Sequence, residues 1–226
     1  MKKLLLASII SGLASVAAAD SFQDFNNNLY AAYQYGSLNG GAGQDASQYG
    51  IGGTFQSKNN VWLNANAVSG VTYPADNSAS GQTTNISNLG FAAGYAFQFF
   101  GDEQQGFQVI PHVDFTTISS GGAVAGTAYI YGLGVKPEYR LLNSLKVAVN
   151  LGVNGQQVGG SSANGTTTET TQVFGYYVSP GVQYDINKTV MLGLDYSYVA
   201  NFNNNSTNNN NTGNLSFVTA KVGYLF

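Results

Sequence analysis

Apolar residues occupy every second position at the end of this chain. The series is Val218, Ala220, Val222, Tyr224 and Phe226. A period of two belongs to a β-strand, because successive side chains of a strand point to opposite faces. The same alternation recurs in ten segments separated by clusters of Gly, Asn, Ser and Thr. The predicted strands are Asn28–Leu38, Ser47–Gln56, Val61–Gly70, Ile86–Phe99, Phe107–Ile118, Thr127–Arg140, Leu145–Gly155, Gln172–Asp185, Thr189–Phe202 and Leu215–Phe226.

The composition places these strands in a membrane. Only 8% of the residues are charged, against roughly 25% in soluble domains. Beyond residue 19 no stretch approaches the roughly 20 apolar residues that a spanning helix needs. Only helices and closed barrels pair all their backbone groups inside a bilayer. We therefore predict an all-β protein, a single antiparallel, up-and-down transmembrane β-barrel of ten strands, with eight as the alternative number.

The two faces of the predicted strands differ in character. One face is apolar, as in Leu89, Phe91 and Ala93, and the other is small or polar, as in Gly90 and Ala92. Charged residues test this assignment, because an outward Lys or Arg at mid-membrane costs about 2–4 kcal/mol. Eight charged residues fall within the predicted strands, all of them on the small or polar face: Asp114, Lys136, Glu138, Arg140, Lys146, Asp185, Asp195 and Lys221. The apolar face is thus predicted to meet lipid.

The interior charges are expected to form a pairing network of Asp114, Lys136, Glu138, Arg140, Lys146, Asp195 and Lys221. Folding the last hairpin about its loop brings Asp195 level with Lys221. Folding the sixth and seventh segments about residue 143 brings Glu138 and Arg140 level with Lys146. Unpaired charges in a confined lumen would be costly, so mutual neutralisation is the expected role.

The connections alternate in length. Short links at Ser57–Asn60, Leu141–Ser144 and Ile186–Lys188 contrast with longer ones such as Gln156–Thr171 and Asn203–Asn214. Short periplasmic turns and longer outer loops are typical of outer-membrane barrels. With an even number of strands, the sequence therefore predicts both chain termini in the periplasm.

The beginning of the chain has the pattern of an export signal. Lys2 and Lys3 precede the apolar run from Leu4 to Val16, and Ala17–Ala19 offers a cleavage site. The run is too short to span a membrane, so it is predicted to be a secretory signal peptide. We expect residues 1–19 to be this signal peptide and residues 20–226 to be the barrel domain.

The terminal motif Val222, Tyr224 and Phe226 resembles the signal by which the barrel-assembly machinery of Gram-negative bacteria recognises its substrates. The whole mature chain resembles small outer-membrane barrels of the OmpA/Opa-like surface-antigen class. This resemblance implies export through the Sec pathway to the bacterial outer membrane. The expected partners are outer-membrane lipid, lipopolysaccharide, periplasmic chaperones and the assembly machinery. We expect a monomer with no cofactor, and the net charge of −3 argues against nucleic acid.

Catalysis and metal binding have little support in the sequence. His112, the single histidine, shares the inner face with Asp114, and such a pair could activate water as it does in the omptin proteases. Here, however, His112 lies near mid-strand, and the sequence offers no second acidic pair at the rim. A hydrogen-bonded interior histidine is the expected outcome, with an outer-membrane hydrolase as the remote alternative. One histidine and no cysteine give no metal-binding motif, and no enzymatic activity is expected.

Two functions remain. Members of the resembled class anchor, adhere, interact with host surfaces or conduct small solutes poorly. The first is a closed barrel with a structural and surface-interaction role through its outer loops, and the second is a narrow porin-like channel for small solutes or ions. An inner face rich in Gly and Ala favours the channel. The bulky inward residues Trp62, Ile110, Tyr177 and Phe217 favour the closed barrel, which we prefer.

Overall fold

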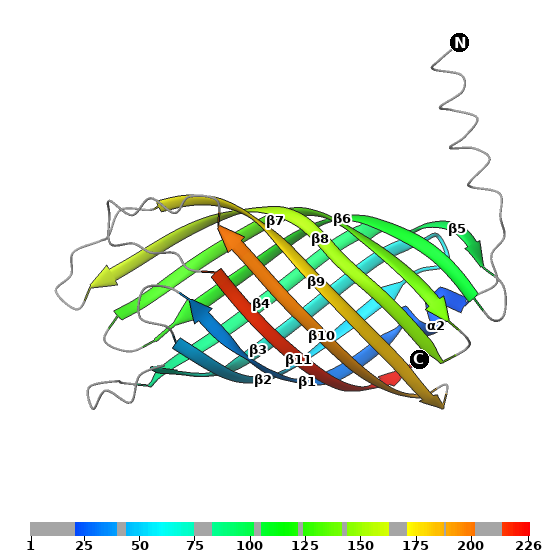
Figure 1. Ribbon diagram of the computed structural model, residues 1–226, viewed down its shortest axis with the longest axis horizontal. Helices are drawn as coiled ribbons and strands as arrows, with labels where there is room; N and C mark the ends of the chain where they lie inside the picture. Colours follow the sequence, from blue (N-terminus) through cyan, green and yellow to red (C-terminus); the bar gives the residue numbers. More distant parts are fainter. Residues whose placement is uncertain are drawn as a thin grey trace, which may run out of the picture.

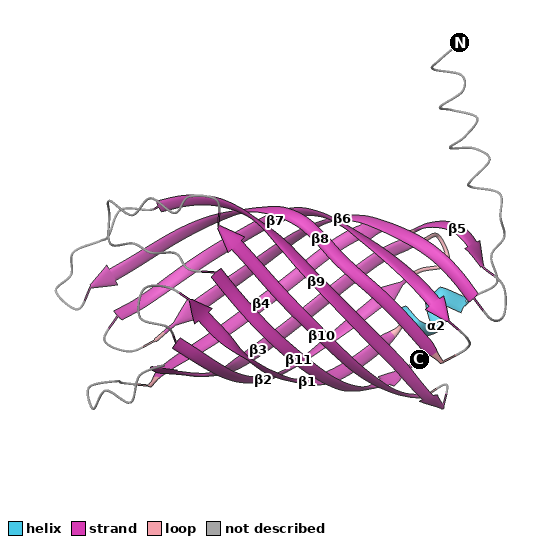
Figure 2. Ribbon diagram, viewed as in Figure 1, coloured by secondary structure: helices cyan, strands magenta, loops and turns pink. Residues whose placement is uncertain are grey.

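The chain forms a closed antiparallel β-barrel in the computed structural model (Figures 1 and 2). The structure describes residues 21–39, 44–74, 83–101, 105–121, 124–141, 144–162, 171–187, 189–201 and 214–226. The expected signal peptide, residues 1–19, lies outside the described residues. Within the described part, no helix has the length and apolar character needed to cross a membrane.

Eleven strand segments and one short helix make up the described fold. They are α2 (Ser21–Asn26), β1 (Asn28–Asn39), β2 (Gln44–Gln56), β3 (Val61–Pro74), β4 (Thr84–Tyr95), β5 (Phe97–Gly101), β6 (Gln105–Ser120), β7 (Val124–Leu141), β8 (Leu145–Ser162), β9 (Thr171–Asn187), β10 (Val190–Asn201) and β11 (Asn214–Leu225). Apart from β4 and β5, which both pair with β6, each strand pairs with its neighbours in sequence, and β1 pairs with β11 from Asn28↔Leu225 to Asn39↔Asn214. The sheet therefore closes on itself without a free edge.

β4 and β5 are two parts of one barrel strand, which confirms the ten-stranded prediction. Both pair with β6, and they are separated by Ala96 alone. The Ala96 amide donates to the Asn60 carbonyl at 2.8 Å, one position beyond the β3–β4 pair Val61↔Tyr95. Its methyl group packs in a buried cluster with Trp62, Ala92 and Ile110. The predicted continuous strand Ile86–Phe99 is thus interrupted at this residue, and its register with β6 is the same on both sides.

The outer wall is apolar and the inner face is polar or small, as the alternation predicts. Large side chains such as Leu29, Ile51 and Leu133 are exposed on the outside. Aromatic rings pair on the outer wall at both ends of the barrel. Phe99, Phe100, Phe107 and Tyr139 cluster near one end, and the pairs Phe115–Tyr129 and Tyr176–Tyr198 lie toward the other. Such aromatic belts mark the two membrane interfaces of a spanning barrel.

Several strands extend further than the sequence pattern predicts. β8 continues to Ser162, inside the expected loop Gln156–Thr171, and β6 and β7 pair as far as Ser120↔Gly126, beyond the predicted strand ends Ile118 and Thr127. Most residues of these extensions are Gly, Ser or Gln. Once a strand leaves the lipid, water can solvate either face, so the alternation disappears while backbone pairing continues.

The two ends of the barrel differ. At one end, called here the α2 end, lie α2, the C-terminal residue and the turn between β2 and β3 (Figure 1). This turn covers Ser57–Asn60 as predicted, and its last residue has φ = 62°, a left-handed conformation that Asn tolerates. The opposite end, called here the loop end, receives the links expected to be longer. The chain terminus and the short turns therefore share one end.

Candidate functional site in the barrel lumen

Helix α2 fills the α2 end of the lumen. Phe22 and Asn26 are fully buried, and Phe25 is 2% exposed, although the helix has only six residues. The barrel holds the helix by its backbone and by a side chain: Gln183 Nε2 donates to the Phe25 carbonyl at 3.1 Å, and Gln23 Nε2 of the helix donates to the Ser57 carbonyl at 3.2 Å. The helix acts as a plug in this mouth of the barrel.

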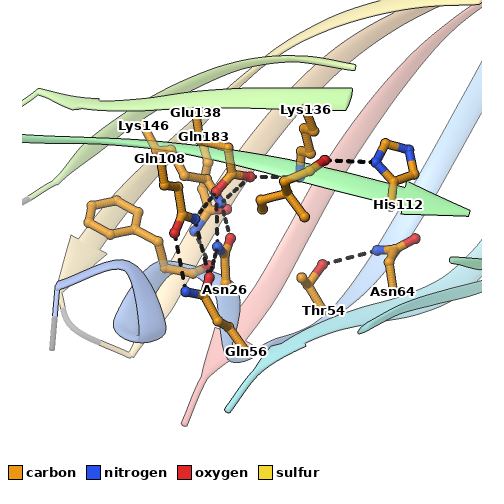
Figure 3. A network of polar contacts seen from close by, with 12 residues as sticks. Asn26, Thr54, Gln56, Asn64, Gln108, His112, Lys136, Glu138, Lys146 and Gln183 are labelled. Atoms are coloured by element: carbon orange, nitrogen blue, oxygen red, sulfur yellow. Dashed lines mark hydrogen bonds and ion pairs between the residues drawn. The ribbon is translucent and has the colours of Figure 1, made fainter. Parts of the chain in front are cut away.

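Asn26 joins the plug to three strands (Figure 3). Its Nδ2 donates to Gln56 Oε1 on β2 at 2.7 Å and to Glu138 Oε2 on β7 at 2.9 Å. Its Oδ1 accepts from Lys146 Nζ on β8 at 2.5 Å. A single amide thus bonds to one neutral and two ionic groups of the wall.

Glu138 is the centre of the predicted charge network. Its carboxylate is fully buried. Oε2 accepts from Asn26 and, at 2.6 Å, from Gln108 Nε2. Oε1 forms ion pairs with Lys136 Nζ at 2.7 Å and Lys146 Nζ at 3.8 Å. Two ammonium groups therefore share one carboxylate.

The other charged residues of the predicted network near the α2 end take separate places. Arg140 stands opposite Lys146 in the β7–β8 register, as expected, and its Nη2 donates to the Gln105 carbonyl at 3.3 Å. Glu138 stands opposite Ala148 and reaches Lys146 diagonally, which corrects the expected level pairing. Diagonal neighbours on one face of a sheet lie within reach of long side chains.

Lys221 and Asp195 form an ion pair inside the barrel, but the hairpin register differs from the expected one. Asp195 stands opposite Thr219, and Lys221 stands opposite Gly193. The two charges are thus diagonal rather than level. The four-carbon stem of the lysine spans this offset, and its Nζ lies 4.8 Å from the centre of the Tyr30 ring.

His112 and Asp114 share the inner face as predicted, but a tyrosine stands between them. Tyr177 Oη donates to Asp114 Oδ2 at 2.8 Å and lies 3.2 Å from His112 Nε2, whereas that nitrogen is 3.8 Å from Asp114 Oδ2. His112 Nδ1 contacts the Ile110 carbonyl at 3.0 Å. Both ring nitrogens of the histidine therefore have partners within the protein.

Glycines on β7 make room for this cluster. A Cβ at Gly132 would lie 2.5 Å from Asp114 Oδ1, and one at Gly134 would lie 2.6 Å from His112 Nε2. Both distances are shorter than van der Waals contact. These glycines thus allow polar side chains from β6 and β9 to meet inside the barrel.

A chamber of about 290 Å³ lies in the lumen. Its lining includes Trp62, Asn64, Lys136, Asn150, Asp195 and Lys221. Lys136 lies over the Trp62 indole, with Nζ 5.0 Å from the ring centre. The predicted bulky inward residues Trp62, Ile110, Tyr177 and Phe217 are all buried. Amides, hydroxyls and charged groups dominate the chamber wall, so it is suited to water or a small polar solute.

The residues of the predicted assembly motif lie on the outer wall. Val222 and Tyr224 belong to β11, and their side chains, like that of Phe226, are exposed. The Phe226 amide donates to the Asn27 carbonyl at 3.0 Å, next to the β1–β11 ladder. In the folded barrel, the motif therefore faces lipid.

Sequence reasoning missed the plug and its glutamine partners. Phe22 and Phe25 are three residues apart and Asn26 follows, a spacing that puts all three on one side of a helical turn. That spacing was the available signal. Gln56 and Gln108, which hydrogen-bond to each other at 3.1 Å and 3.2 Å, gave no distinguishing pattern. No cluster of three or more His, Asp or Glu suited to a metal occurs among the described residues.

Comparisons with known proteins agree with this architecture. The sequence profile of the OmpA-like transmembrane domain matches residues 26–226. A comparison with curated proteins finds no match. The transport unit of the autotransporter AIDA-I from Escherichia coli aligns with a TM-score of 0.50 at 10% identity, covering 97% of both chains.

Two further structures show weaker overall likeness. The outer membrane protease OmpT from Escherichia coli aligns with a TM-score of 0.49 at 9% identity, covering 88% of this chain and 94% of the other. Ail, the attachment invasion locus protein of Yersinia pestis, has a TM-score of 0.46 at 12% identity, covering 88% and 97%. At sequence identities this low, a structural match is informative about the fold but not about the activity.

Proposed function

The chain belongs to the OmpA-like transmembrane domain family and is an outer-membrane β-barrel protein, and on this premise we propose that it works as a closed barrel with a structural and surface-interaction role. The α2 end faces the periplasm, and the loop end faces outward. Its partners are outer-membrane lipid and lipopolysaccharide, with the assembly machinery and periplasmic chaperones acting during export. The proposal includes no ion-conducting or catalytic role.

The observation that carries this proposal is the plug. The mouth at the α2 end is occupied by buried phenylalanine rings and by a hydrogen-bonded layer around Asn26 and Glu138 (Figure 3). A hydrated pore would need a continuous path through this layer. Displacing the helix would remove the Asn26 hydrogen bonds of Glu138 and Lys146, and a buried charge that loses a partner is costly.

A second layer of bulky groups supports closure. Trp62, Ile110 and Tyr177 are buried in the lumen, and His112 packs its ring against Trp62 with centres 5.6 Å apart. Because both His112 ring nitrogens already have partners, we assign the histidine a structural position and not the activation of water.

The surface-interaction part of the proposal is supported by the shape of the loop end. β7 and β8 have 18 residues each and β9 has 17, whereas a tilted spanning strand needs about 9–11. The surplus residues lie at the loop end, where the polar extensions are found. These strands therefore carry the connecting loops beyond the membrane, where they can meet other surfaces.

Conductance tests the closed barrel. Purified protein in planar bilayers should show no steady ohmic current. The double variant Phe22→Ala, Phe25→Ala should open transiently, because it removes the packing of the plug while leaving the wall intact. Asn59→Ala, in an exposed turn at the same end, serves as the matched control and should stay silent. Steady current through the unaltered protein would refute closure and favour the narrow channel.

The loops test the surface role. Bacteria that display the barrel with residues 163–170 and 203–213 replaced by Gly-Ser linkers should adhere less to cultured host cells than bacteria that display the unaltered barrel. Heat-modifiable migration in gels should show equal amounts of folded barrel in both strains. Equal adherence at equal display would remove the surface-interaction role and leave a structural one.

A further inference from the structure

The half of the lumen next to α2 carries more basic than acidic side chains. The inward groups there are Lys136, Arg140, Lys146 and Lys221 against Glu138, Asp185 and Asp195. The remaining interior acid, Asp114, accepts the Tyr177 hydroxyl and does not line the chamber. The chamber therefore has an excess of positive charge, which favours a negatively charged occupant.

Lys136 is the ammonium group best placed to receive such an occupant. Its side chain is 19% exposed in the lumen, whereas that of Lys146 is 7% exposed and is held by Asn26. Lys136 has an ion pair to Glu138 at 2.7 Å and lies over the Trp62 ring. An ammonium has three donors, so these contacts leave donor capacity directed toward the chamber.

Two residues that line the chamber, Trp62 and Asn150, have polar atoms without a hydrogen-bond partner among the described residues. Trp62 is 3% exposed, and its Nε1 has no hydrogen-bond partner among the described residues. Buried indole N–H groups ordinarily have one. The Asn150 Oδ1 likewise has none in the described part of the chain. Since an amide can present either a donor or an acceptor, Asn150 can bond to an oxyanion or to its hydroxyl.

We propose that the chamber is a binding site for a small oxyanion, held by Lys136 and the Trp62 indole N–H. Inorganic phosphate has the required charge and several acceptor oxygens, and lysine commonly binds phosphate as a point charge. Entry is from the loop end. The proposal does not depend on conduction, since a site reached from one side binds its ligand equally in a closed barrel.

The chain carries its own probe of this site, because Trp62 is its single tryptophan. Indole fluorescence of the purified barrel in detergent should change saturably as sodium phosphate is added, while sodium chloride at matched ionic strength leaves it unchanged. Lys136→Met should weaken phosphate binding roughly tenfold or more, as expected for loss of a charged hydrogen bond. Lys58→Met, in the exposed Ser57–Asn60 turn, removes the same charge outside the chamber and should bind like the unaltered protein.

A second measurement uses the unaltered barrel alone and so does not depend on whether Lys136→Met folds. Iodide should quench Trp62 more than caesium does, and phosphate should protect against iodide. A linear response to phosphate, an equal response to chloride, or equal loss in Lys58→Met would overturn the proposal. Equal quenching by iodide and caesium, without phosphate protection, would overturn it as well. If the fluorescence change saturates only at molar phosphate, phosphate is an adventitious ion only and the proposal is overturned.

Discussion

Replacing Asn26 by Ala should destabilise the whole barrel, although the residue lies in a helix of only six residues. The substitution removes hydrogen bonds to Gln56, Glu138 and Lys146. Hydrogen bonds to charged groups contribute about 1.5–3 kcal/mol each and neutral ones about 0.5–1.5 kcal/mol. Undocking of α2 lets water reach the charges and limits the loss. We therefore expect unfolding to become easier by about 3–5 kcal/mol, the range for breaking a buried ionic contact.

Reversible unfolding by urea in lipid vesicles, followed by Trp62 fluorescence, measures this loss. The midpoint should fall with little change in the slope, since the surface exposed by unfolding is nearly the same. Asn59→Ala, in the exposed turn at the same end, should stay within about 0.5 kcal/mol of the unaltered protein. A loss below about 1 kcal/mol for Asn26→Ala would show that the plug is not coupled to the wall, and the reasoning about closure would fail with it.

Three further predictions concern the lumen, assembly and topology. A double-mutant cycle of Asp195→Asn and Lys221→Met should give a coupling energy of about 1–2 kcal/mol, between the values for exposed and buried ion pairs, because the two side chains are 31% and 23% exposed. Unfolding in detergent measures this coupling energy, and a value of zero would show that the ion pair does not stabilise the barrel. Changing Phe226 to Ser should lower the yield of heat-modifiable barrel in outer-membrane fractions, and an unchanged yield would show that this residue is dispensable for recognition. A cysteine at Asn209 should react with an impermeant label on intact cells while one at Asn59 should not, and the reverse result would invert the topology.

The strand number and the two faces could be predicted from the sequence because both follow from a local rule. Side chains alternate along any strand, and lipid tolerates only apolar groups on the outside. Thus the interior position of Lys221 followed from its spacing to Val222. The end of β8 at Ser162 could not be predicted in this way, since a strand that continues beyond the lipid no longer needs the alternating pattern.

Contacts across the lumen could not be predicted from the local sequence pattern. Tyr177 on β9 meets Asp114 on β6 although β7 and β8 lie between them, so the contact depends on the circumference and stagger of the barrel. Helix α2 was missed for a related reason. A helix of six residues is not stable alone, and the wall around Asn26 holds it in place.

The first and last strands meet, and this makes the barrel a candidate for circular permutation. Phe226 N lies 3.0 Å from the Asn27 carbonyl oxygen, and Ser21 is one helix of about 9 Å away from that point. A short linker could therefore join the two ends, and new termini could be opened at a link of the loop end such as residues 163–170. The permuted chain would keep every strand pairing but would move the terminal phenylalanine into the interior of the polypeptide. Such a protein would separate the strand pairing that stabilises the folded barrel from the terminal phenylalanine that is expected to direct its insertion.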